Sequence, residues 1–262
     1  MEAPFTVGAG EKKEEKEYVM GLEKGLAIIE AFGICKGPLT LTHAAEITGH
    51  SKAAVRRGLL TLCKLGYAQQ DGRQFKLAPR SLRLGHAYVA SDPLTKVAQP
   101  ILEMTSERTR ESASIAVLDS QDAVFGARST HRRSLSSGLG VGARLPAYCS
   151  ATGRVLLSEM PPAEVEFMLN RMARPALTPH TRTGVREIME QVTLVRANGF
   201  ALGDQELEIG LRSIAVPIRN SRGNLIAAMS LSVATSRMTR EEVIEQLLPE
   251  METARRNFAS LL

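Results

Sequence analysis

The segment from Leu41 to Gly66 limits the possible folds more than any other part of the chain. It reads LTHAAEITGHSKAAVRRGLLTLCKLG, which predicts a short helix, a tight turn and a longer basic helix. Thr42 is a candidate N-cap, and Gly49 can end the first helix in the left-handed conformation. Ser51 can cap the second helix, whose apolar residues recur at helical spacing: Val55, Leu59, Leu62 and Leu65. The pattern is typical of a helix-turn-helix, whose second helix enters a DNA major groove.

The residues that follow predict a basic hairpin. Two strands are expected at 67–70 and 73–77, joined by a turn at Asp71-Gly72. Phe75 and Leu77 are expected to pack inward, which leaves Arg73 and Lys76 free to meet phosphates. A helix-turn-helix followed by such a hairpin is a winged helix. The alternative is a basic helical hairpin in an unrelated domain.

The charge distribution favours the winged helix. Between His50 and His86 there are eight Lys or Arg residues and one acid, a net charge of +7, whereas the whole chain is only +5. A local excess of this kind is the electrostatic signature of phosphate contacts. The expected DNA contacts are therefore Ser51, Lys52, Ala53, Arg56, Arg57, Arg73 and Lys76.

Composition is consistent with a cytoplasmic protein of two domains. The chain has 262 residues, of which 44% are hydrophobic, and no apolar run is long enough for a membrane span. Its first residues lack the apolar core of a signal peptide. The three cysteines, Cys35, Cys63 and Cys149, are odd in number and far apart, so a disulfide framework is not expected.

Shifts in composition predict four segments. Residues 1–17 contain a run of mixed charges and are expected to form a disordered tail. The winged helix-turn-helix domain is assigned to 18–80 and linker helices to 81–110, with Ser91-Asp92-Pro93 starting the second of them. The domain at 111–262 alternates strands and helices, which suits an α+β fold with helices on a sheet. Strands are expected at 112–118, 123–128, 144–148, 209–218 and 225–234, and helices at 152–159, 163–171, 184–197 and after Thr239.

Several motifs together resemble the IclR family of bacterial transcriptional regulators, over about residues 18–258. They are GLEKGL from Gly21, FKLAPR from Phe75, RLPAYC from Arg144, GRVLL from Gly153 and DQELEIGLRSIAVPI from Asp204. The chain is most similar to the subgroup that responds to protocatechuate, 4-hydroxybenzoate or β-ketoadipate. The resemblance implies a ligand-responsive regulator of aromatic-acid catabolism. Its implied partners are operator DNA, a small carboxylic acid, a second copy of the chain in a dimer or tetramer, and RNA polymerase.

The resemblance also implies a GAF-like second domain with an effector pocket on the open face of its sheet. Carried over by position, the pocket residues would be Ser134, Ser137, Ala151, Thr152, Asp204, Leu211, Ser213, Ser230 and Ser232. Amide groups at the start of the 152–159 helix suit a carboxylate. Ser230 and Ser232 alternate within an apolar strand and therefore face one side. Where the subgroup commonly has Thr-Ser-Met after Tyr-Cys, this chain has Ser150-Ala151-Thr152, which could widen the pocket.

No catalytic residue, metal site or cofactor is expected. The glycines from Gly138 to Gly142 lack the spacing of a nucleotide-binding loop. The histidines and cysteines have no metal-ligand spacing, and no nucleophile elbow is present. Three alternatives stay open: an IclR-type regulator of another carboxylic-acid pathway, a constitutive DNA-binding protein whose second domain only oligomerises, and an enzyme with a nucleic-acid-binding appendage.

Overall fold

The computed structural model describes residues 18–35, 37–130 and 139–261. The chain divides into two compact units, Met1–Ala87 and Tyr88–Leu262. The boundary falls inside one helix, α5 (Leu82–Ser91), and each unit has its own apolar core. Within the described ranges, no helix has the length and apolar character needed to cross a membrane.

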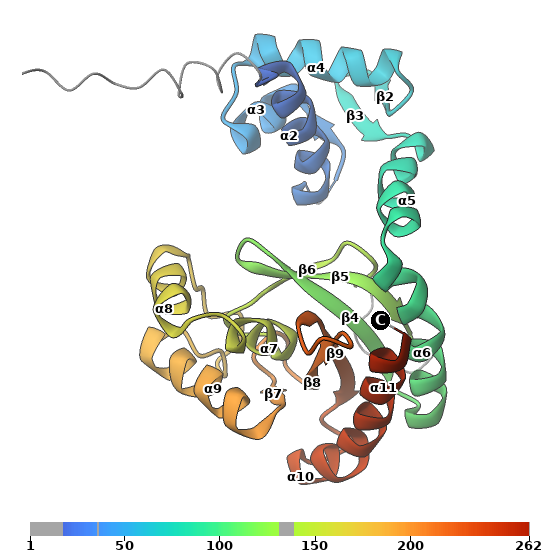
Figure 1. Ribbon diagram of the computed structural model, residues 1–262. Helices are drawn as coiled ribbons and strands as arrows, with labels where there is room; N and C mark the ends of the chain where they lie inside the picture. The colour runs from blue at the N-terminus through green and yellow to red at the C-terminus, as the bar shows by residue number, and fades with distance from the viewer. Residues whose placement is uncertain (1–17, 36, 131–138, 262) are drawn as a thin grey trace, which may run out of the picture. The chain divides into compact units, whose positions relative to one another are not determined.

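In the described part of the first unit, helices pack on a small antiparallel sheet (Figure 1). The helices are α2 (Met20–Ile34), α3 (Leu41–Thr48) and α4 (Lys52–Lys64). The strands β1 (Leu39–Thr40), β2 (Ala68–Asp71) and β3 (Gln74–Leu77) lie in the order β1-β3-β2. Ile28, Leu39, Leu59 and Phe75 meet in the core, so helices and sheet stabilise one another. A short turn of helix, η1 (Pro79–Ser81), follows the sheet.

The turn between α3 and α4 largely follows the sequence prediction. Gly49 ends α3 with φ +67°, and the Ser51 side chain caps α4 by accepting from the Ala54 backbone N–H at 3.3 Å. The assignment of Thr42 as N-cap is wrong. Thr40 holds that position because the chain enters α3 directly from β1, and its hydroxyl accepts from the His43 backbone N–H at 3.2 Å.

Of the two hairpin residues predicted to pack inward, only Phe75 does so. Phe75 is buried, but Leu77 is 39% exposed at the open end of the hairpin, opposite Ala68. Leu65 is 52% exposed because α4 has ended one residue before it. The hairpin turn falls at Gly72 and Arg73, one residue later than predicted, since Asp71 still pairs with Gln74.

A six-stranded antiparallel sheet organises the second unit, in the order β6-β5-β4-β9-β8-β7. Its strands are β4 (Ser112–Asp119), β5 (Asp122–Ser129), β6 (Arg144–Pro146), β7 (Ala201–Asp204), β8 (Leu211–Arg219) and β9 (Leu225–Ala234). β6 ends at Pro146 rather than at Tyr148 as predicted. β7, which the sequence analysis did not anticipate, forms the opposite edge.

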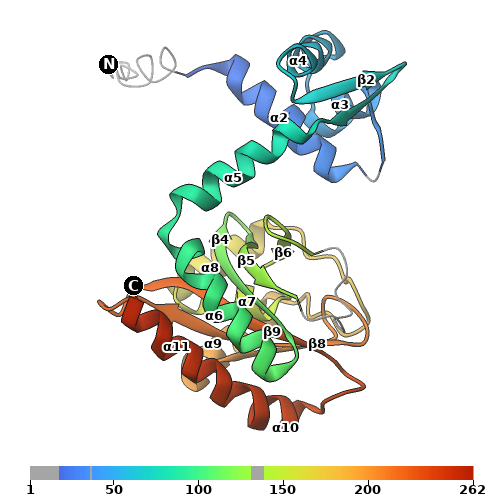
Figure 2. The ribbon, with the colours of Figure 1, turned by 90° about the vertical axis from the view of Figure 1, so that its right-hand side faces the viewer.

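Helices cover both faces of this sheet (Figures 1 and 2). On one face α6 (Pro93–Thr109) and α11 (Leu248–Leu261) lie side by side and bury Leu102 and Phe258 against Ile214 and Met229. On the other face lies α7 (Ala151–Ser158), with α8 (Pro162–Arg171) and α9 (Val185–Asn198) packed behind it. Two helices on one face and one short buried helix on the other leave part of the second face for a cavity.

The ends of the outer helices match the predicted caps. The Asp92 carboxylate accepts from the Leu94 and Thr95 backbone N–H groups at the start of α6. Thr239 and Glu242 form a capping box at the start of α10 (Arg240–Glu242). A π-helical turn, η2 (Val243–Leu247), joins α10 to α11. Because α6 packs on the second sheet, the predicted linker segment divides, and its second helix belongs to the second unit.

Candidate functional site

The first candidate surface is the outer side of α4 together with the hairpin. Val55, Leu59 and Leu62 are buried and fix the helix against the core. The polar residues of the helix therefore face outward. All seven residues that the sequence assigns to DNA contact are exposed, namely Ser51, Lys52, Ala53, Arg56, Arg57, Arg73 and Lys76. Three of them, Lys52, Arg56 and Arg57, are basic residues on α4, so the helix presents positive charge of the kind that contacts phosphates.

Arg56 and Arg57 border two different hollows. Arg56 lines a hollow between α3, α4 and the hairpin, together with Thr42, Gln70 and Arg73. Arg57 lines a separate groove between α4 and α2. The difference follows from helix geometry, because adjacent residues project about 100° apart.

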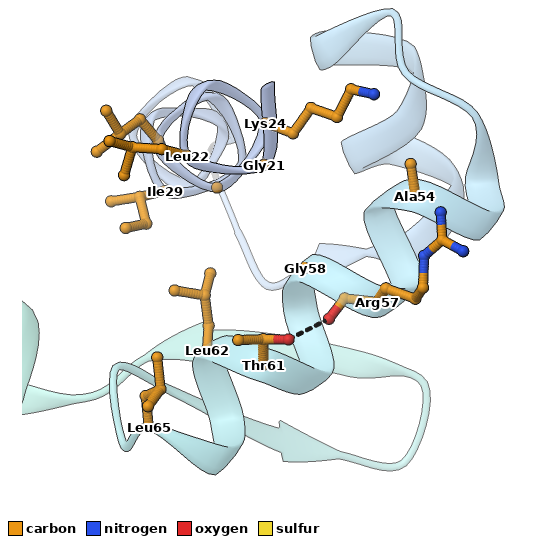
Figure 3. A pocket seen from close by; sticks show the side chains of 12 residues that line it. Gly21, Leu22, Lys24, Ile29, Ala54, Arg57, Gly58, Thr61, Leu62 and Leu65 are labelled. Atoms are coloured by element: carbon orange, nitrogen blue, oxygen red, sulfur yellow. Dashed lines mark hydrogen bonds between the residues drawn. The ribbon is translucent and has the colours of Figure 1, made fainter. Parts of the chain in front are cut away.

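The groove between α2 and α4 is apolar at one end and basic at the other. Figure 3 shows Leu22, Ile29, Leu62 and Leu65 gathered at one end, with Lys24 and Arg57 at the other. The helices approach closely at Gly58, where an added Cβ would lie 2.3 Å from the Ile28 Cδ1 atom. A side chain at residue 58 would therefore require the end of the Ile28 side chain, or the two helices, to shift.

The second candidate site is a cavity between the sheet of the second unit and the start of α7. Its walls leave about 360 Å³ free of protein atoms, mouth included. Only about 20 Å³ of this admits the centre of a water molecule, so the interior is narrow. The lining residues are Phe125, Arg128, Leu139, Leu145, Ser150, Ala151, Thr152, Leu207, Leu211, Ser213, Ser230 and Ser232.

Three serines form the sheet side of the cavity. Ser230 and Ser232 lie on the same face of β9, as the sequence alternation predicts, while Met229 and Leu231 point into the core of the opposite face. Ser213 on β8 pairs with Ser232 across the sheet. The result is a row of hydroxyl groups on an otherwise apolar face, each able to donate and to accept a hydrogen bond.

The first turn of α7 forms a second wall. The Ser150 hydroxyl caps the helix by accepting from the Gly153 backbone N–H at 3.1 Å. The N–H groups of Ala151 and Thr152 belong to the first turn of the helix, where no carbonyl group of the same helix can accept from them. They lie at the positive end of the helix dipole. Gly203 on β7 lies beside this turn and leaves room for the Ser213 side chain, because an added Cβ would lie 2.9 Å from the Ser213 Oγ atom and 3.6 Å from the Ala151 backbone nitrogen. This turn therefore presents amide donors to the cavity.

A bulge in β5 places an arginine on the third wall. The pairing of β4 with β5 shifts at Ile115 and Ala116, where Gly126 is the extra residue. The strand alternation therefore reverses, and Phe125 and Arg128 line the same cavity although they are three residues apart. The Arg128 guanidinium lies 5.4 Å from the centre of the Phe125 ring. Burial lowers the pKa of Arg128, but an arginine keeps its charge in proteins.

Six of the nine residues predicted for the effector pocket come together in this cavity: Ala151, Thr152, Leu211, Ser213, Ser230 and Ser232. Ser134 and Ser137 lie outside the described residues. Asp204 does not line the cavity, so its assignment there is corrected. Asp204 pairs with Arg212 on the neighbouring strand. Arg212 lies two residues before Ile214 on β8, so both side chains face the side of the sheet that α6 and α11 cover. The Arg212 Nε atom donates to the Asp204 Oδ1 atom at 3.0 Å.

Six lining residues were missed by the sequence reasoning: Phe125, Arg128, Leu139, Leu145, Ser150 and Leu207. The sequence contains a signal for Phe125 and Arg128, namely Gly126 between them. A glycine inside a strand pattern indicates a bulge, after which the side chains switch to the opposite side of the sheet. Ser150 lies in the segment that the sequence comparison marked as altered beside the pocket, and the structure makes it the N-cap of α7. Leu207 follows a strand that the sequence analysis did not anticipate.

Cys149, which directly precedes the N-cap residue of α7, does not have the properties of a nucleophile. Cys149 is fully buried, and burial raises the pKa of its thiol to about 11. The thiol is therefore protonated at neutral pH, whereas nucleophilic cysteines need a low pKa. Over the described ranges, no three His, Cys, Asp or Glu side chains are grouped to hold a metal ion.

Both units match models of one protein family. Residues 21–72 match the IclR helix-turn-helix domain, and residues 86–259 match the C-terminal domain of bacterial transcriptional regulators of the IclR type. The chain thus belongs to the IclR family of bacterial transcriptional regulators, a class of DNA-binding proteins and not of enzymes.

Among its relatives is the Pca regulon regulatory protein of Pseudomonas putida, 42% identical over 95% of this chain and 86% of the relative. Another is the p-hydroxybenzoate hydroxylase transcriptional activator of Acinetobacter baylyi, 37% identical over 97% and 96%. A candidate transcriptional regulator from Rhodococcus sp. RHA1 has the same fold, with a TM-score of 0.80 and 39% identity over 94% of this chain and 98% of that one. The inducer-binding domain of PobR from Acinetobacter, a double mutant in complex with 3-hydroxybenzoic acid, is similar over 64% of this chain and 98% of that domain (TM-score 0.60, 33% identity).

Proposed function

We propose that this regulator controls genes of aromatic-acid catabolism by binding a monocyclic hydroxybenzoate in the cavity of its second unit. The observation that carries the proposal is the combination of one arginine, the first turn of α7 and three serines around a narrow cavity with apolar side chains. The names of the relatives, a p-hydroxybenzoate hydroxylase activator and an inducer domain with bound 3-hydroxybenzoic acid, support the same ligand class.

The polar groups are separated in a way that suits such a molecule. A carboxylate can be held by the Arg128 guanidinium or by the amides of Ala151 and Thr152, all of which carry positive potential. The ring can lie against Phe125 and Leu211, and the serine hydroxyls of the sheet can pair with a ring hydroxyl. An affinity in the micromolar range, roughly −8 kcal/mol, is within reach for about ten heavy atoms.

The narrowness of the cavity connects binding to a change of shape. The space that admits the centre of a water molecule is too small for a benzoate, and we therefore infer that the walls move apart as the ligand binds. A ligand that favours the widened arrangement shifts the population toward it, and DNA binding changes if the two arrangements differ in DNA affinity. This is the mechanism proposed for effector response.

Operator binding is assigned to α4 and the hairpin of the first unit. One recognition helix reads few base pairs, and useful specificity therefore requires two half-sites bound by a dimer or tetramer of this chain. Activation of transcription would in addition require contact with RNA polymerase.

Titration calorimetry with a panel of acids tests the effector assignment. We expect 4-hydroxybenzoate or protocatechuate to bind, and Ser230→Ala to weaken the best ligand by about 1–2 kcal/mol through loss of a buried hydrogen bond. If only β-ketoadipate or another aliphatic acid binds, the aromatic assignment is wrong, and the chain is a regulator of another carboxylic-acid pathway. Failure of every acid to bind would favour a second unit that only oligomerises.

A further inference from the structure

Glu206 has a buried carboxylate and lies in the loop between β7 and β8, next to the cavity-lining residue Leu207. Its side chain is only 1% exposed. The Arg154 guanidinium donates to it through two parallel bonds, Nη1 to Oε1 and Nη2 to Oε2, each 2.6 Å. Arg182 adds its Nη1 atom at 2.8 Å and its backbone N–H at 3.2 Å. The four acceptor positions of the carboxylate are thus all occupied.

These bonds join three segments that are distant in the sequence. Arg154 lies on α7, Arg182 lies between α8 and α9, and Glu206 lies between two strands. The loop of Glu206 is held at its backbone as well, since the Thr178 and Thr181 hydroxyls donate to the carbonyls of Gln205 and Glu206. Glu206 is therefore the point where the loop and α7 are held together.

Two of the joined segments form cavity walls. Leu207, the residue after Glu206, lines the cavity, and Ala151 and Thr152 line it from the first turn of the helix that carries Arg154. Glu206, Arg154 and Arg182 do not line it themselves. The ion pair therefore acts on the cavity only through the position of its neighbours.

Stability alone is a weak reason for burying such a pair. Replacing a buried ion pair with apolar residues of similar volume is often neutral or stabilising, while its bidentate geometry fixes the two partners in one orientation. We propose that Glu206 is a positioning residue for the effector cavity: it holds the first turn of α7 and the loop of Leu207 at a fixed spacing, and so sets the affinity for the aromatic acid. This inference rests on the function proposed above.

The test uses the full chain with the pair replaced by apolar residues, Arg154→Met together with Glu206→Leu. A matched control is Asp204→Leu with Arg212→Met, which removes a largely buried ion pair two residues away that faces the opposite side of the sheet. The readouts are the melting temperature, the Kd of 4-hydroxybenzoate by calorimetry well below that temperature, and hydrogen–deuterium exchange of the 150–157 and 204–211 peptides without ligand.

We expect the pair variant to bind at least tenfold more weakly and to exchange faster in both peptides, with operator affinity in the absence of effector unchanged. The control variant is expected to keep its Kd for 4-hydroxybenzoate within twofold of the wild type, even if its melting temperature falls as much as that of the pair variant. A Kd and exchange rates in the pair variant that match the control would overturn the positioning role. Should the pair variant fail to fold, Glu206→Asp keeps the charge but shortens its reach, and the same comparison applies to it.

The two proposals fail in different ways. If the wild-type chain binds no hydroxybenzoate, the effector assignment is lost, and the exchange data alone decide whether Glu206 holds the two walls. If the wild-type chain binds and the pair variant binds equally well, the effector assignment stands and the role of Glu206 is rejected.

Discussion

At the scale of single residues, the basic side chains of the first unit are expected to contribute unequally to DNA binding. Arg56 lies beside the hairpin on α4, the proposed recognition helix, whereas Lys76 lies on the hairpin itself. We expect Arg56→Ala to weaken operator binding by about 1–3 kcal/mol with less effect on random DNA. Lys76→Ala should weaken both and reduce the salt dependence by about one phosphate contact. Gel shifts at several salt concentrations measure both effects.

Arg186→Ala is the control for these variants, because its side chain is 93% exposed on α9 of the second unit. It should bind operator as the wild type does. Operator affinity retained in Arg56→Ala would remove the assignment of α4 as the recognition helix.

Glu111 is expected to make stability depend on pH. It is buried at the start of β4; burial raises the pKa of its carboxyl to about 7, and the Arg237 guanidinium 2.6 Å away opposes part of this rise. The folded state thus holds the proton more tightly than the unfolded chain. Its contribution to stability is complete below about pH 4.5 and is lost as pH rises through 7.

Glu111→Gln should therefore remove part of the pH dependence. Between pH 5 and pH 8, we expect the wild-type free energy of unfolding to fall by about 2–3 kcal/mol more than that of the variant. Urea unfolding at both pH values gives the difference. Parallel curves for the two proteins would mean that Glu111 titrates in the native chain as it does in the unfolded one.

The residues of the cavity show where sequence reasoning reaches its limit. Ser230 and Ser232 were predictable because a regular strand alternates strictly. Arg128 was not placed on the same wall because that alternation reverses at the Gly126 bulge, a feature of the pairing with β4. Asp204 was assigned to the pocket by its position in the resemblance alone, because β7, with only four residues, shows no pattern from which the side that Asp204 faces could be predicted.

At the scale of elements, the long helices and strands were predictable and their short partners were not. The helices have caps that can be recognised locally, such as Ser51, Asp92 and Thr239. β1 has two residues and exists only because it pairs with β3. The same pairing moves the N-cap of α3 from Thr42 to Thr40. Elements defined by a distant partner leave no periodicity of their own in the sequence.

The packing of α2 against α4 predicts a coupling between two residues. Gly58→Ala adds a Cβ that would lie 2.3 Å from the Ile28 Cδ1 atom, and Ile28→Val removes that atom. The alanine should gain about 1 kcal/mol of helix propensity and lose about 1–3 kcal/mol to the clash. The valine alone should cost about 0.5–1.5 kcal/mol. In the double variant the clash disappears, so the pair should be more stable than the sum of the singles by at least about 1 kcal/mol.

Urea unfolding of the isolated first unit, residues 1–87, measures this cycle without the transition of the second unit. A coupling energy near zero would show that Ile28 turns aside without cost, and that the close approach at Gly58 does not set the distance between the helices.

At the scale of the whole molecule, the division into two units with separate cores predicts that their activities can be separated. The isolated segment 88–262 contains the complete six-stranded sheet, the helices on both faces and every lining residue of the cavity. It lacks α4 and the hairpin, the predicted DNA contacts. We expect it to fold, to bind 4-hydroxybenzoate within about threefold of the full chain, and to have no measurable operator affinity.

The full chain should differ from this segment in one informative respect. If effector binding changes operator affinity, linkage requires operator DNA to change effector affinity by the same factor. Calorimetry of the full chain with and without saturating operator measures that factor, and the isolated segment must show none. A coupling of 5–150-fold corresponds to about 1–3 kcal/mol between the two sites. Equal effector affinity in the presence and absence of operator, together with unchanged transcription, would mean that the second unit does not control the first through this ligand.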